Sequence, residues 1–215
     1  ISDVACGTGP YKLTSIDLAT SAMLERNDDY RLAPAAIEKV ELRYVGDRST
    51  ASVQLETGDL DIMSIDPSQL VSFENNDKFT VEKVQTLKTA LLAINTTVAP
   101  LDNKLVRQAM TYAVDKKSII TIAYENCAVP ARLQASDTNC FGVDFSDATD
   151  FSYNPEKAKE LLAEAGYPNG LNFADYGIQM DVLGGTYMEK AAQVMQQNFA
   201  DVGITIELRL SLIHI

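Results

Sequence analysis

Residues 91–115 read LLAINTTVAPLDNKLVRQAMTYAVD, and this stretch carries the main fold signal. The run 89–95 is apolar on both faces, which is typical of a central, buried strand. Pro100 marks a turn, and Asp102 is a suitable N-cap for the helix that follows. The inward stripe of that helix is Leu105, Ala109 and Ala113. A strand, a turn and a capped helix predict the beginning of an α/β lobe.

Before this stretch the pattern predicts mostly strands. A hairpin is expected over residues 12–18 and 21–26, and a third strand over 39–45. Val40, Leu42 and Tyr44 lie on one face of that third strand, which predicts a half-buried strand. Asp47 and Gly58 bracket a helix that ends near Glu56, followed by a short strand over 60–62. A second short helix is expected near Pro67, and strands over 79–85 and 89–95.

Helices dominate the second half of the chain. Asp115 is expected to cap a helix with Ile119, Ile122 and Ala123 inward. Asn154 and Pro155 should begin another, with an apolar stripe of Ala158, Leu161, Leu162 and Ala165, closed by Gly166. A strand near 178–182 precedes the last helix, for which Thr186 and Glu189 predict a capping box. The apolar stripe of that helix is Met188, Ala191, Ala192, Met195, Phe199 and Val202, and it ends at Gly203, before an alternating strand over 204–210.

Several motifs resemble one family. Residues 7–13 (GTGPYKL), 24–30 (LERNDDY), 58–62 (GDLDI) and 153–167 (YNPEKAKELLAEAGY) follow, in this order, patterns of the extracellular solute-binding proteins of family 5. These are the peptide, nickel and oligosaccharide receptors of ABC importers. The stretch 91–115 resembles the same family. The resemblance implies a lobe of the periplasmic-binding-protein type II class, with a mixed β-sheet flanked by helices.

The resemblance also implies a domain organisation. Residues 1–45 are expected to be strands that link to or complete a first lobe, and residues 46–210 to form the second-lobe α/β domain. The tail 211–215 follows the last strand without a turn signal, so it is either a natural strand end or foreign sequence from a truncated reading frame. The chain is therefore expected to be a fragment that covers mainly the second lobe.

Composition limits the function classes. The chain of 215 residues has 30 carboxylates against 18 Lys and Arg, for a net charge of −12, which argues against binding nucleic acid. It has no apolar run near the roughly 20 residues that cross a bilayer, so no membrane insertion is expected. The single histidine, His214, lies at the extreme end, which excludes histidine-based hydrolase and zinc sites within the domain. We expect no catalytic residues, metal or cofactor.

Weaker signals leave alternatives open. Cys127 and Cys140 bracket part of the aperiodic segment 125–152, where a disulfide would suit an exported protein, but the spacing equally allows two unpaired thiols. Cys6 is left without a partner. Asp137 lies in a faint calcium-loop pattern, whose final ligand position is occupied by Ala148 instead of glutamate. A long aperiodic segment in a compact domain is usually functional.

Candidate ligand-binding residues lie where loops leave the carboxyl ends of strands. The first candidate is the turn formed by Leu183, Gly184, Gly185, Thr186 and Tyr187. Its glycines allow close backbone approach, and the N–H groups at the helix start favour carboxylates. The resemblance implies a cleft-lining role for the same turn, although a plain strand-to-helix connection has equal weight. The second-rank candidates are Asn95, Leu133, Gln134 and Asp137.

The expected function is the substrate-binding component of an ABC importer, a monomer that captures a di- or oligopeptide between two lobes and delivers it to permease subunits. The resemblance implies a location in the periplasm or on the outer face of the membrane, with a lipid anchor in the full-length protein as an open alternative. The alternative class is a carboxylate-dependent hydrolase of extracellular peptide or glycan. Such an enzyme needs two acids roughly 5 to 9.5 Å apart, for example near Asp66, Asp137 or Asp181.

Overall fold

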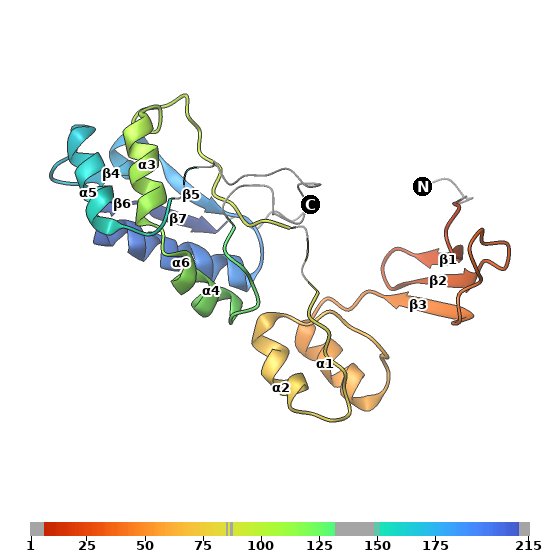
Figure 1. Ribbon diagram of the computed structural model, residues 1–215. Helices are drawn as coiled ribbons and strands as arrows, with labels where there is room; N and C mark the ends of the chain where they lie inside the picture. The colour runs from red at the N-terminus through yellow and green to blue at the C-terminus, as the bar shows by residue number, and fades with distance from the viewer. Residues whose placement is uncertain (1–6, 85, 87, 132–148, 150, 211–215) are drawn as a thin grey trace. The chain divides into compact units, whose positions relative to one another are not determined.

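The computed structural model describes residues 7–84, 86, 88–131, 149 and 151–210 (Figure 1). The chain divides into two compact units, Ile1–Ile65 and Asp66–Ile215. The first unit holds the N-terminal strands and also helix α1 (Arg48–Thr57). The division between the units therefore lies one helix further along the chain than residue 45, where the boundary was expected. The assignment of these segments to two lobes stays a prediction.

An antiparallel sheet forms most of the first unit. Its strands are β1 (Tyr11–Asp17), β2 (Ser21–Arg26) and β3 (Lys39–Arg43), in the order β1-β2-β3, and the expected hairpin and third strand are confirmed. The buried Asn27 closes the hairpin. Its Nδ2 donates to the carbonyl oxygen of Gly9 at 3.1 Å, and its backbone N–H donates to that of Pro10 at 2.9 Å. Asn27 therefore ties the return of β2 to the entry of β1.

The caps of α1 are as expected, but two predictions nearby are wrong. The Asp47 carboxylate accepts from the backbone N–H of Thr50 at 2.7 Å, and Gly58 ends the helix at φ +83°. Residues 60–62, however, form no strand. The third strand is also not half-buried, because Leu42 is 55% exposed and only Val40 is partly covered. The alternation of apolar and polar residues predicts to which face of the sheet a side chain points. It does not predict whether another part of the protein packs on that face.

The beginning of the second unit departs most from expectation. The 3-10 turn η1 (Pro67–Gln69) and helix α2 (Leu70–Glu74) confirm the short helix near Pro67. The expected strands over 79–85 and 89–95 are absent from the described residues of these ranges. Leu92 and Ile94 pack on the core while Leu91 is exposed. Alternate side chains of the run are thus partly buried, but its described residues lack the hydrogen-bonded neighbour that a strand needs.

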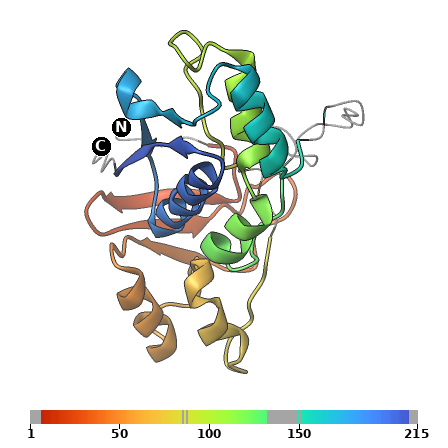
Figure 2. The ribbon, with the colours of Figure 1, turned by 90° about the vertical axis from the view of Figure 1, so that its left-hand side faces the viewer.

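Helices and short parallel strands build the core of the second unit (Figure 1, Figure 2). Helix α3 packs on α5, helix α4 packs on α6, and α6 also contacts three strands. The strand pairs are parallel, β4 with β6 and β5 with β7. The bounds are α3 (Lys104–Ala113), α4 (Lys116–Tyr124), α5 (Pro155–Glu164), β4 (Leu171–Asn172), the 3-10 turn η2 (Phe173–Tyr176), β5 (Gln179–Val182), α6 (Thr186–Asp201), β6 (Ile204–Thr205) and β7 (Glu207–Leu210).

The α/β class is confirmed, and the core contains most of the expected stripes, although α3 buries Val106 and Met110 and only partly covers Leu105. Completely buried side chains come from α3, α5, η2, α6 and β6, and they are Val106, Ala109, Ala113, Ala158, Phe173, Phe199 and Ile204. Small residues where α3 meets α5 allow the two helices to approach closely. Asn154 caps α5 through its side-chain oxygen, which accepts from the backbone N–H of Lys157 at 2.9 Å. Gly166 follows this helix at φ +99°, as expected.

Three details of the helices correct the sequence analysis. Asn103, and not Asp102, caps α3, and its Oδ1 accepts from the backbone N–H of Leu105 at 2.9 Å. Ile122 points outward, since α4 buries Ala123 and only partly covers Ile119. Gly185, and not Thr186, is the N-cap of α6. The helix therefore begins one residue earlier than the polar pattern indicated.

A polar contact within the second unit joins α4 to α6. The backbone N–H of Asp115 donates to Oδ1 of the buried Asn198 at 3.0 Å. The carboxylate of Asp115 in turn accepts from the backbone N–H groups of Lys117 at 3.0 Å and Ser118 at 3.3 Å. Partial burial acts to raise the pKa of Asp115, but the hydrogen bonds from Ser118 and Lys117 together lower it below its ordinary value.

The lowered pKa predicts an acid-sensitive contribution to stability. A depressed folded-state pKa stabilises the protein above the unfolded pKa of about 3.9, and this stabilisation is lost as the pH falls through the folded value. We expect Asp115→Asn to lower the free energy of unfolding by about 0.5–1 kcal/mol at neutral pH and by less at about pH 3. Urea denaturation at both pH values measures this, with the exposed Asp77→Asn as control. An equal loss at both pH values would contradict it.

Candidate ligand-binding site

The turn between β5 and α6 lies where the sequence analysis expected it. Leu183 and Gly184 leave the carboxyl end of β5, and Gly185 begins α6. Gly184 has φ +130°, and a Cβ there would lie 2.8 Å from Cγ of Met188. A side chain at this position would therefore be strained and would also collide with α6. Leu183 is 55% exposed, so the turn presents backbone and one apolar side chain to solvent.

The start of α6 favours negative charge only weakly. Gly185 has no side chain to cap the helix, and its carbonyl oxygen accepts from the backbone N–H groups of Met188 at 2.8 Å and Glu189 at 3.3 Å. The aligned dipoles of the helix attract anions to this end. Glu189, however, already brings a carboxylate to the first turn. The turn is consequently better suited to a neutral or zwitterionic group than to a strong anion.

An aromatic pair borders this turn, and the sequence analysis found only half of it. The rings of Tyr187 and Tyr124 have centroids 5.5 Å apart at an interplanar angle of 54°. The hydroxyl of Tyr124 donates to Sδ of Met188 at 3.3 Å. Burial, with a smaller contribution from Tyr187, raises the pKa of Tyr124, so its phenol is neutral at physiological pH. Tyr124 ends α4, and only the packing of α4 on α6 brings it here.

The second-rank candidates do not join this site among the described residues. Asn95 is exposed and its Oδ1 accepts from Thr97, from the backbone N–H at 3.0 Å and from Oγ1 at 2.8 Å, which makes it a turn residue. Leu133, Gln134 and Asp137 lie outside the described residues, as do Cys6, Cys140 and the side chain of Thr186. Cys127 is an exposed free thiol, which agrees with the unpaired alternative of the sequence analysis.

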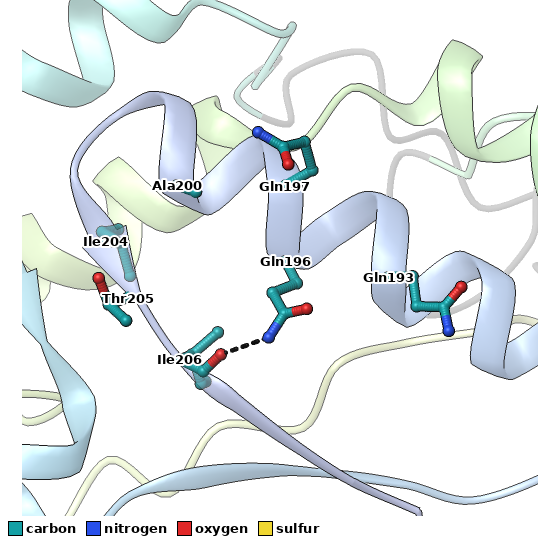
Figure 3. Close-up of a pocket in the computed structure, with 7 residues that line it drawn as sticks. All are labelled: Gln193, Gln196, Gln197, Ala200, Ile204, Thr205 and Ile206. Atoms are coloured by element: carbon teal, nitrogen blue, oxygen red, sulfur yellow. Dashed lines mark hydrogen bonds between the residues drawn. The ribbon is translucent and has the colours of Figure 1, made fainter.

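A separate pocket of about 250 Å³ opens between the C-terminal half of α6 and β6 (Figure 3). Gln196 points from the helix towards the strand, and its Nε2 donates to the carbonyl oxygen of Ile206 at 2.7 Å. The lining residues are Gln193, Gln196, Gln197, Ala200, Ile204, Thr205 and Ile206. This pocket was not predicted from the sequence, although Gln193, Gln196, Gln197 and Ala200 recur at i, i+3, i+4 and i+7 on one side of the helix.

The titratable groups of the described residues form no metal centre. No three His, Cys, Asp or Glu side chains among them are placed to hold a metal ion. Asp181, a candidate acid of the alternative hydrolase, forms a bidentate ion pair with Arg209 across β5 and β7, at 2.6 and 2.7 Å. In the part of the chain that the structure describes, no helix has the length and apolar character to cross a membrane.

The second unit is a lobe of α/β type, with an exposed turn at the carboxyl end of β5. The sequence model of the bacterial extracellular solute-binding proteins, family 5 Middle, matches residues 2–211. The chain belongs to this family.

Individual relatives agree with this membership. Heme-binding protein A of Haemophilus influenzae is 31% identical over 92% of this chain and 36% of its own length. The nickel-binding periplasmic protein of Escherichia coli is 30% identical over 94% of this chain and 41% of its own length. The periplasmic binding protein DppA of Helicobacter pylori, solved with the peptide STSA, has a TM-score of 0.76 and 28% identity over 95% of this chain and 39% of its own. The chain thus spans about two fifths of the length of these proteins.

Proposed function

We propose that this chain is part of the substrate-binding component of an ABC importer, which captures a small extracellular solute between two lobes and delivers it to the permease. The observation that carries the proposal is the exposed turn of Gly184 and Gly185 beside Tyr187, at the carboxyl end of β5, in a chain of this family. Ligands of two-lobed proteins bind where both lobes contribute contacts, and the lobes close on them by a hinge. In this proposal the protein acts outside the cytoplasm and as a monomer.

The ligand that this turn suits best is a di- or oligopeptide. The start of α6 can accept the carboxylate of a zwitterion, and the Tyr124–Tyr187 pair offers an apolar surface to a side chain. The names of its relatives show that the family takes chemically different ligands, namely heme, nickel, glutathione and peptide. Two features support a peptide as the ligand of this chain. They are the weak preference of the start of α6 for anions and the neutral Tyr124–Tyr187 pair.

The placement of the carboxylates favours a binding role over the alternative, a carboxylate-dependent hydrolase. A glycosidase or a carboxylate-dependent peptidase needs two acids that face a common cleft. Asp181 is held by Arg209 on the exposed face of β5 and β7, and Asp137 lies outside the described residues. The relatives are transport-associated binding proteins. We therefore assign the chain no catalytic step.

The proposal predicts that the 215-residue chain binds peptide poorly by itself. Closure around a ligand is driven by contacts that both lobes make, and one lobe supplies only part of them. Isothermal titration calorimetry with short peptides should give dissociation constants weaker than about 100 μM, which corresponds to less than about 5.5 kcal/mol of binding free energy. Submicromolar affinity of this chain for a peptide would contradict the proposal that it supplies only part of the binding site.

The site itself is tested in a two-lobed protein of the relatives' length that contains this sequence. Tyr187→Ala should weaken peptide binding by about tenfold, because buried tyrosine side chains often carry much of the binding energy. Asp201→Asn, at the exposed end of the same helix and outside the pocket, should leave binding unchanged. Equal affinity of both variants would remove the turn from the binding site.

A further inference from the structure

The thioether side chain of Met188 contacts both the candidate turn and the aromatic pair that borders it. Met188 lies in the first turn of α6, directly after Tyr187. A Cβ built on Gly184 would lie 2.8 Å from Cγ of Met188 and 3.2 Å from its Cβ. The stem of the side chain therefore lies against the backbone of the turn. Its sulfur accepts the hydrogen bond from the hydroxyl of Tyr124 at 3.3 Å.

The hydrogen bond to the sulfur links the turn to both tyrosine rings. Burial raises the pKa of Tyr124, so the hydroxyl keeps its proton and remains a donor. The ring of Tyr124 in turn contacts the ring of Tyr187, at a centroid distance of 5.5 Å. A chemical change at the sulfur of Met188 would therefore reach Tyr187 through one hydrogen bond and one ring contact.

The thioether is the group of this site that oxidants alter most readily. Met188 is only partly covered, whereas Met110 and Met180 are buried. Oxidation converts the apolar thioether into a polar, chiral sulfoxide, and methionine sulfoxide reductases reverse it. The sulfur attacks a peroxide with a lone pair, the O–O bond breaks, and an S–O bond forms. The sulfur loses two electrons, and the proton of the transferred oxygen passes to the hydroxide, which leaves as water.

We propose that Met188 is an oxidation switch of the candidate ligand-binding site. Formation of its sulfoxide displaces Tyr124 from the turn, changes the position of the Tyr187 ring and weakens ligand binding. The effect on ligand binding rests on the proposed function, and the effect on the two rings does not.

The geometry explains why the rings must move. A sulfoxide oxygen is a stronger acceptor than a thioether sulfur, and Tyr124 already directs a donor at this position. An O–H···O bond keeps its two oxygens about 2.7–2.8 Å apart, and the added oxygen has to fit where Sδ and the hydroxyl are now 3.3 Å apart. The backbone of Gly184 blocks the stem of Met188 from yielding in its direction. The hydroxyl and ring of Tyr124 therefore give way.

The effect on the rings is tested without ligand in the 215-residue chain, with its three cysteines replaced by serine. Hydrogen peroxide is the oxidant, and mass spectrometry of proteolytic fragments measures sulfoxide at each of the six methionines. Oxidation of Met188 should shift the NMR resonances of the Tyr124 and Tyr187 rings. Met195 is the matched control, because it lies on the same helix and is also partly covered. Its oxidation in the Met188→Leu variant should leave both rings unchanged.

The effect on binding is tested in a two-lobed protein of the relatives' length that contains this sequence. The probe is the tripeptide alanyl-phenylalanyl-alanine. Oxidation should weaken its binding by about tenfold, as expected when one tyrosine anchor is displaced, and sulfoxide reductases should restore it. Leucine conserves the volume of methionine and has no sulfur to oxidise. Met188→Leu should therefore bind equally before and after peroxide, whereas Met195→Leu should lose affinity as the unmutated protein does.

Three outcomes would overturn the proposal. Met188 could stay reduced while Met195 reacts, the tyrosine resonances could remain unchanged after complete oxidation of Met188, or peroxide could weaken binding equally in Met188→Leu. Failure of the unoxidised two-lobed protein to bind peptide would contradict the proposed function instead. The ring resonances would then still decide whether Met188 controls the position of the two tyrosines.

Discussion

Replacing Phe199 with alanine should lower the free energy of unfolding of the second unit by about 3–5 kcal/mol. Phe199 has no exposed surface and lies on the apolar stripe of α6. That helix contacts α3 and α4 and also β5, β6 and β7. Removal of the ring would leave a cavity that elements held on several sides cannot fill by collapse. Because domains of this size are stable by only about 5–15 kcal/mol, the loss would be a large part of the total.

Urea denaturation followed by circular dichroism measures this loss, and the same helix provides the control. Gln197 is exposed, and its Nε2 donates to Oδ1 of Asp201 at 2.9 Å on the surface. Gln197→Ala should change the free energy of unfolding by no more than about 0.5 kcal/mol, as is usual for surface positions. Similar midpoints for the two variants would mean that α6 does not hold the core together.

The second large effect is expected at Gly170, which precedes β4. Gly170 has φ +98°, and a Cβ there would lie 2.6 Å from the carbonyl oxygen of Gly203. That oxygen accepts from the backbone N–H of Leu171 at 2.9 Å, where β4 begins to pair with β6. Gly170→Ala should cost about 2–5 kcal/mol, from the left-handed backbone together with the collision.

Gly166→Ala separates the two contributions. Gly166 has nearly the same backbone angle, φ +99°, but a Cβ added there would meet no atom within 4 Å. This variant should lose only the backbone contribution of about 1–2 kcal/mol. Thermal denaturation of both variants gives the comparison, and an equal loss would show that β4 and β6 can move apart without cost.

The sequence determined the local structure of this protein. The caps at Asp47, Asp115 and Asn154 and the glycine that ends α1 are made between residues a few positions apart, so their chemistry is complete within the sequence. The helical stripes around Ala158 were also predictable, because helical periodicity reports which side is buried. The family motifs extended this to the class of fold. Of the candidate site, the sequence located the turn at Gly184 and Gly185.

The tertiary structure decided what depends on distant partners. Residues 89–95 have the composition of a central strand, yet their described part lacks a paired neighbour, and pairing is a property of two segments. Tyr124 reaches Tyr187 only because α4 packs on α6. The face that carries Leu42 was predictable from alternation, but its exposure was not. Periodicity records the direction in which a side chain points, and only the packing of other parts of the protein determines whether anything lies there.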